Sequence, residues 1–118
     1  MKRFLIIARQ APYGSAAARE AIELALACAL FDQPVSLLLL DDACFQLLPE
    51  HKPAAIQQKN LAAMQQSLPL YDVDKIYICE KSMHQRGLQP ESLSLEVVPL
   101  DAAGMKELIR EHEVVINV

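Results

Sequence analysis

The sequence has no tryptophan and only three glycines among its 118 residues, and its acidic residues outnumber its basic ones, which leaves a net charge of −4. The loop at residues 12–15 has one glycine and no lysine, so it is neither a P-loop nor a G-x-G-x-x-G nucleotide motif. Chains that bind duplex DNA or tRNA directly are usually basic, which disfavours that class of protein. Repeats, charge runs and low-complexity tracts, which would indicate a solenoid or a disordered chain, are also missing.

Long hydrophobic runs are missing as well. The apolar run at residues 4–8 is shorter than the roughly 7–15 residues of a signal-peptide core, and Arg19, Glu20 and Glu23 interrupt the apolar stretch 16–31. The three cysteines are an odd number, in a chain large enough to fold without disulfides. We therefore expect free thiols, no membrane association and a cytoplasmic location.

The sequence does contain a regular alternation of short apolar runs and helical patterns. Its composition, 53% hydrophobic and 22% charged, predicts one globular domain over residues 1–118. Strands that alternate with helices form parallel sheets with right-handed crossovers. The prediction is therefore an α/β fold with a doubly wound, five-stranded parallel sheet in the order 2-1-3-4-5. The predicted strands are 4–8, 35–40, 75–79, 93–98 and 114–118, the predicted helices are 19–31, 54–68, 80–86 and 101–112, and a short helical turn is predicted at 43–49.

Cys79 is the candidate catalytic residue, because it ends the third predicted strand just before a short helix. Ligands gather at the carboxyl ends of parallel strands, and a helix N-terminus stabilises a thiolate. Two interpretations follow. Cys79 is either a nucleophilic or persulfide-carrying thiol, or a small apolar residue packed at a strand end, which is the commoner use of a free cysteine. Spacing alone favours the second.

The segment 44–49 is unusually apolar for a connection between elements. It brings together Phe45, Leu47 and Leu48. These side chains either fold down onto the core or form an apolar surface that a partner chain covers. The glutamine-rich helix predicted after the segment slightly favours the second interpretation, an interface with a partner chain.

Neither a metal nor a cofactor is predicted. The histidines share no metal-ligand spacing with each other or with cysteine. The pair Asp41-Asp42 more often caps a turn than binds Mg²⁺, and a flavin or nucleotide binder is supported only by analogy of fold. In the order 2-1-3, one strand separates the strands that precede Cys44 and Cys79, so no disulfide between them is expected.

Several distinctive runs occur along nearly the whole chain. Residues 11–20 read A-P-x-G-x-A-A-x-R-E and residues 45–49 read F-Q-L-L-P. Shorter runs are Met1-Lys2-Arg3, Lys52-Pro53, Leu70-Tyr71-Asp72, and Cys79 followed after six residues by Arg86-Gly87-Leu88. Together, all of these runs resemble the TusC branch of the DsrE/DsrF-like family.

The resemblance implies the fold predicted above and a role in a cytoplasmic sulfur-relay complex. In this family TusC assembles with TusB and TusD into a heterohexamer, which takes persulfide sulfur from a donor protein and passes it to an acceptor protein, toward 2-thiolation of the wobble uridine of certain tRNAs. The sulfur-carrying cysteine belongs to TusD and follows its third strand. Cys79 with Arg86-Gly87 matches it by position, but residues 80–84 are bulkier and more charged than in the active subunit.

The resemblance therefore implies an assembly subunit with TusB-like and TusD-like partners. We expect Phe45, Leu47 and Leu48 to form the surface that binds these partners, and the net charge of −4 argues against direct contact with nucleic acid. The alternative is a sulfurtransferase in its own right, with Cys79 as the persulfide carrier.

Overall fold

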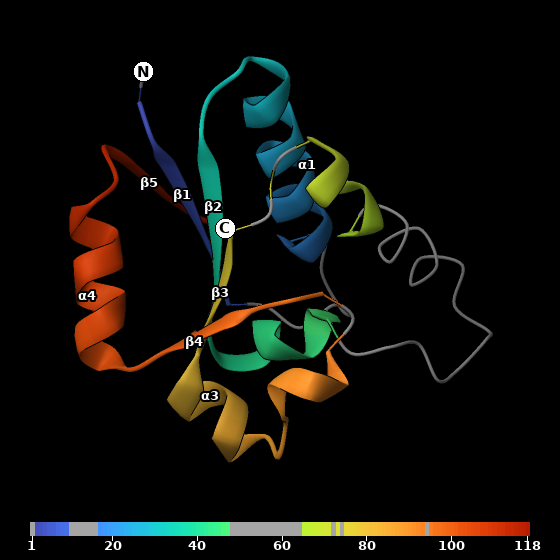
Figure 1. Ribbon diagram of the computed structural model, residues 1–118, viewed down its shortest axis with the longest axis vertical. Helices are drawn as coiled ribbons and strands as arrows, with labels where there is room; N and C mark the ends of the chain where they lie inside the picture. The colour runs from blue at the N-terminus through green and yellow to red at the C-terminus, as the bar shows by residue number, and fades with distance from the viewer. Residues whose placement is uncertain (1, 10–16, 48–64, 72, 74, 94) are drawn as a thin grey trace.

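A parallel sheet stands between α1 on one side and α4 on the other (Figure 1). The computed structural model describes residues 2–9, 17–47, 65–71, 73, 75–93 and 95–118. Its elements, in which η denotes a 3-10 helix, are β1 (Phe4–Ala8), α1 (Ala17–Leu30), β2 (Val35–Leu39), η1 (Asp41–Leu47), η2 (Pro69–Tyr71), β3 (Ile76–Cys79), α3 (Glu80–Gln85), η3 (Pro90–Ser92), β4 (Val98–Leu100), α4 (Ala102–Arg110) and β5 (Val114–Asn117).

The five strands pair in parallel in the order β4-β3-β2-β1-β5. The predicted α/β class with five parallel strands is confirmed, and the strand order is corrected: β1 lies between β2 and β5, and β2 pairs directly with β3. The apolar runs indicate buried parallel strands but do not specify which neighbour each strand takes. The topological switch point consequently lies between β1 and β5, not beside β3.

The sheet is buried on both faces, because successive strand residues point to opposite sides. On one face Ile6, Leu37 and Ile78 belong to the larger core, which also takes side chains from α1, η1 and α3. On the other face a smaller core joins Leu5 to Leu108 of α4, together with Ile7 and Leu38. Burial on both faces explains why the strands read as unbroken apolar runs rather than as alternating ones.

The helix ends follow local sequence signals. The Asp101 carboxylate accepts a hydrogen bond from the Gly104 N–H at 2.8 Å and caps α4, as an aspartate at this position commonly does. Gly87 has a φ of +68° after α3, and the Leu88 N–H donates to the Met83 carbonyl, which makes a glycine-ended cap. Within the described residues, no helix combines the length and the apolar character needed to cross a membrane.

Two predicted elements differ from the structure or lie outside it. The predicted strand 93–98 is observed only from Val98 to Leu100. Leu93, Leu95 and Val97 alternate with polar residues and pack partly against the larger core. These three residues lie before the segment that pairs with β3, so they are not part of the strand. Most of the predicted helix 54–68 lies outside the described residues, and residues 65–67 are helical.

Candidate functional site

Cys79 is the last residue of β3 and the N-cap of α3, which confirms its predicted position at the carboxyl end of the third strand. Its sulfur accepts a hydrogen bond from the Ser82 N–H, with 3.4 Å between Sγ and N. The residue is 7% exposed. The strand therefore ends with Cys79 at the sheet edge, where the residue is buried and its sulfur is hydrogen-bonded to the first turn of α3.

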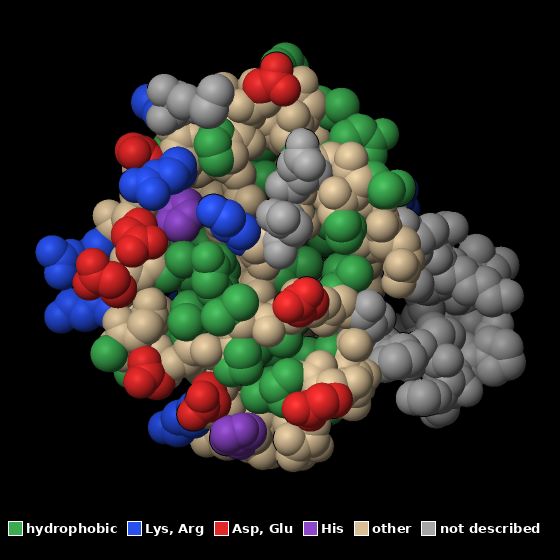
Figure 2. Space-filling model, viewed as in Figure 1, with side chains coloured by type: hydrophobic (Ala, Val, Ile, Leu, Met, Phe, Trp, Pro, Cys, Tyr) green, Lys and Arg blue, Asp and Glu red, His purple; other side chains and the backbone are tan. Residues whose placement is uncertain are grey.

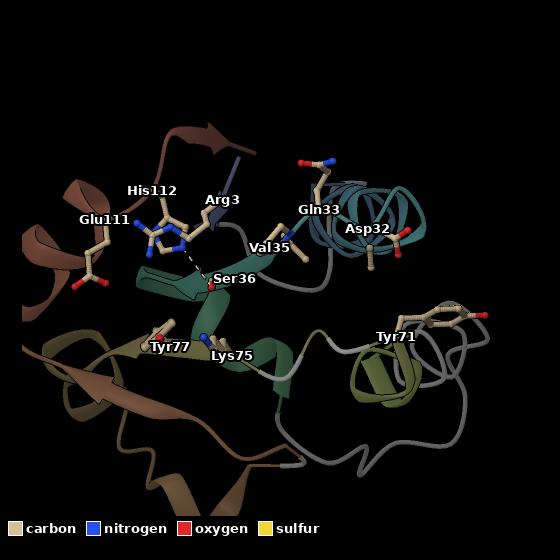
Figure 3. A pocket seen from close by; sticks show the side chains of 12 residues that line it. Arg3, Asp32, Gln33, Val35, Ser36, Tyr71, Lys75, Tyr77, Glu111 and His112 are labelled. Atoms are coloured by element: carbon tan, nitrogen blue, oxygen red, sulfur yellow. Dashed lines mark hydrogen bonds between the residues drawn. The ribbon is translucent and has the colours of Figure 1, made fainter. Parts of the chain in front are cut away.

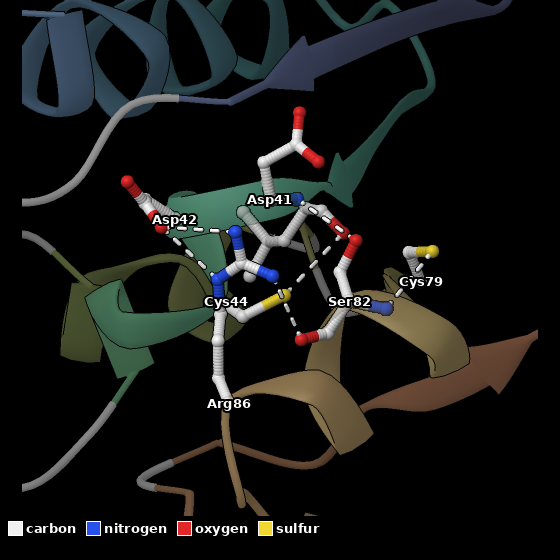
Figure 4. A network of polar contacts seen from close by, with 7 residues as sticks. Asp41, Asp42, Cys44, Cys79, Ser82 and Arg86 are labelled. Carbon is white, nitrogen blue, oxygen red and sulfur yellow. Dashed lines mark hydrogen bonds and ion pairs between the residues drawn. The ribbon is translucent and has the colours of Figure 1, made fainter.

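A polar clamp, made by Asp41, Asp42, Ser82 and Arg86, joins η1 to α3 beside Cys79 (Figure 4). The Ser82 hydroxyl accepts a hydrogen bond from the Asp41 N–H at 3.0 Å. Arg86 donates from Nε to Asp42 Oδ1 at 3.0 Å and from Nη1 to the Ser82 carbonyl at 3.1 Å. Ser82 thus links the turn after β2 to the cysteine sulfur, which it reaches through its own N–H.

The clamp refines the prediction for the Asp41-Asp42 pair. Asp41 has a φ of 51°, in the left-handed region that tight turns use, so it does shape the turn after β2. Asp42 instead forms an ion pair with Arg86, at 3.0 Å between Nη2 and Oδ1. Because the partners stand far apart in the sequence, no local pattern indicates this pair; the only signal is the Arg86-Gly87 run after Cys79.

Cys44 lies close to the same network, completely buried, with its sulfur 4.0 Å from the Leu39 carbonyl oxygen. Burial raises the pKa of the Cys44 thiol to about 11; the Arg86 guanidinium acts to lower it, while Cys79 and Asp41 raise it further. Because β2 and β3 are direct neighbours, the prediction that a strand separates the two cysteines is wrong. Cys44 and Cys79 are nevertheless both free thiols.

The stability of the protein should fall in alkaline solution because of Cys44. Its pKa is about 11 in the folded state against an ordinary value of 9.0, so the folded state holds this proton more tightly than the unfolded state does. The contribution is fully present below pH 9 and is lost as the pH rises toward about 11. Urea unfolding between pH 9 and about 11 measures the free energy of unfolding. As the pH rises, this free energy should fall less steeply for Cys44→Ala than for the unchanged chain. Parallel declines would contradict the assignment to this thiol.

The predicted interface residues are placed only in part. Phe45 is half-buried in η1 and packs against the larger core, next to the fully buried Ala43 and Cys44. Leu47 ends η1, but its side chain lies outside the described residues, as does all of Leu48. The beginning of the segment therefore folds onto the core, and whether its remaining surface faces a partner stays a prediction.

The ionisable side chains do not gather into a metal centre in the part of the chain that the structure describes. There, no group of three or more histidine, cysteine, aspartate or glutamate residues is arranged to hold an ion. Among the described residues, the chemistry at this edge of the sheet comes from the thiols of Cys79 and Cys44 and from the clamp beside them.

Known proteins resemble the chain over its whole length. The model of the DsrE/DsrF-like family matches residues 2–118. The chain is 45% identical over 113 residues to a protein named TusC homolog from Pseudomonas aeruginosa, a match that covers 96% of this chain and 95% of that protein. It is 32% identical over 118 residues to protein TusC from Escherichia coli K12, which covers 99% of each. Among solved structures, the ychN protein from E. coli shares the fold, with a TM-score of 0.85 and 23% identity over 100% of both chains.

Proposed function

Because the chain belongs to the DsrE/DsrF-like family, we propose that it is a subunit of a cytoplasmic sulfur-relay complex that passes persulfide sulfur toward 2-thiolation of a tRNA wobble uridine. Within that complex it acts mainly in assembly, bound to TusB-like and TusD-like subunits in a heterohexamer. Its similarity over nearly full length to proteins named TusC supports this assignment.

The burial of Cys79 is the observation that carries the assembly role. In persulfide transfer, the acceptor thiolate attacks the terminal sulfur of the donor persulfide, and the donor cysteine leaves as a thiolate, so the two sulfurs must meet. Cys79 is only 7% exposed, and its sulfur is held by the Ser82 N–H. A protein donor would reach this sulfur only after the residues around it had moved.

A second apolar surface supports assembly independently of Phe45. Leu30 and Phe31, at the end of α1, are 68% and 78% exposed, and Leu70 in η2 is 82% exposed. Hydrophobic side chains gather on this side of the molecule, over α1 and η2 (Figure 2). Apolar groups that cluster at the surface typically mark contact sites for other chains.

The alternative function is that of a sulfurtransferase in its own right, with Cys79 as the persulfide carrier. The position of Cys79 at the end of β3 favours it. Incubation of the chain with a persulfide donor, followed by intact-mass analysis, separates the two functions. Assembly alone predicts no added sulfur on Cys79, together with co-purification of TusB-like and TusD-like chains. A sulfur adduct that disappears in Cys79→Ser would establish the alternative.

Cys79→Ser is expected to lower tRNA 2-thiolation only modestly in cells whose TusD-like cysteine is intact. The reason is that a covered sulfur in an assembly subunit does not lie on the transfer route. The measurement is the 2-thiouridine content of tRNA, with Cys28→Ser as the matched control, because Cys28 lies on α1 away from this edge of the sheet. Complete loss of 2-thiouridine in a correctly assembled Cys79→Ser complex would make Cys79 the carrier.

A further inference from the structure

The structure contains a cavity at the edge of the sheet opposite to Cys79. It has a volume of about 370 Å³, which lies within the range of small-molecule sites. The residues that line it precede or begin the strands: Arg3 before β1, Ser36 in β2, Lys75 before β3 and His112 before β5. The cavity is therefore built from the amino ends of neighbouring strands and is independent of the Cys79 site.

A buried hydroxyl lies in the wall of the cavity. Ser36 is 5% exposed, although it is polar and lies in a strand that is otherwise apolar. Its Oγ lies 3.4 Å from Nε2 of His112, and Nδ1 of the same ring lies 2.7 Å from the Leu108 carbonyl oxygen. The second contact fixes the orientation of the imidazole, since Nδ1 must donate to a carbonyl, and so places Nε2 and Ser36 Oγ at the cavity.

Two cationic side chains line the same cavity. Lys75 has no ion-pair partner among the residues that the structure describes. Arg3 meets Glu113 through Nε at 3.7 Å, a long contact between two half-exposed side chains that leaves its terminal nitrogens available. In Figure 3 the Lys75 amine, Ser36 Oγ and the His112 ring lie together, whereas the carboxylates of the other lining residues, Asp32 and Glu111, lie to the two sides.

We propose that this cavity binds a small phosphate monoester, with the phosphate between Lys75 and Arg3. Arginine and lysine are the side chains that recognise phosphate through charge-assisted hydrogen bonds. A cavity of about 370 Å³ has room for more than a bare ion, and Tyr77, which lies beside Lys75 in Figure 3, offers an aromatic surface to the organic part. This proposal is independent of the sulfur-relay function.

The test is a titration of the ¹⁵N-labelled full chain, followed by NMR, with inorganic phosphate, ribose 5-phosphate and AMP as probes at constant ionic strength. Ribose without phosphate is the uncharged comparison. We expect saturable shifts confined to the amides around Arg3, Ser36, Lys75 and His112, and tighter binding of the esters than of phosphate. Lys75→Ala should weaken binding by about tenfold or more, because a charge-assisted hydrogen bond is lost.

Lys106→Ala is the matched control, since it removes the same charge from an exposed position on α4 and should change the affinity less than about twofold. Arg3→Ala is a second variant, expected to weaken binding by several-fold while the amide spectrum shows an intact fold. The proposal is overturned if no probe saturates, if the shifts map to the Cys79 edge, or if Lys75→Ala and Lys106→Ala weaken binding equally.

Discussion

Phe45→Asp should strongly weaken binding of the chain to the proposed partner subunits, while the isolated chain still folds. Phe45 is half-buried, so part of the ring packs on the larger core and part remains available to another chain. Burial of a large apolar side chain contributes roughly 1.5–3 kcal/mol, and a carboxylate at the same point adds a desolvation cost. Assembly should therefore weaken by about 100-fold or more.

The measurement compares the melting temperature of the isolated variant with its size-exclusion profile after mixing with TusB-like and TusD-like subunits. Leu47→Asp is expected to behave in the same way. Ile109→Asp is the control, because Ile109 is 41% exposed on α4, on the other face of the sheet. Unfolding of the isolated Phe45→Asp chain would mean that the segment is core. A stable monomer that assembles normally would mean that it is neither core nor interface.

Leu108→Ala is expected to lower the free energy of unfolding by about 2–5 kcal/mol, a large part of the roughly 5–15 kcal/mol of an ordinary domain. Leu108 is 5% exposed and is the one buried residue of α4 among those described. It packs with Leu5, Ile7 and Leu38 in the smaller core. The helix would lose its main apolar anchor and leave a cavity over the sheet.

Urea unfolding of the full chain measures this loss. Ile109→Ala on the same helix should cost less than about 1 kcal/mol, because its side chain is 41% exposed. Equal losses for the two variants would mean that helix propensity, not burial, holds α4 in place.

Much of the local structure could be predicted from the sequence because it depends on near neighbours. The apolar runs marked the strands, Asp101 and Gly87 marked helix ends, and Cys79 was placed correctly at the end of β3. Where the prediction differed, at residues 93–97, the alternating burial came from packing on the core and not from the β-ladder. The periodicity of apolar residues in a sequence indicates which side chains are buried, but it does not indicate which elements bury them.

By itself the sequence determined the α/β class, the single run of alternating strands and helices, and the family to which the chain belongs. Only the tertiary structure decided the strand order, the burial of Cys79 and the pairing of Arg86 with Asp42. The amino-end cavity also became visible only there, since its walls come from segments spread over the whole chain. The physical reason is that helix caps and buried strands are specified within a few residues. Strand neighbours, charge pairs and cavities depend instead on the path of the whole chain.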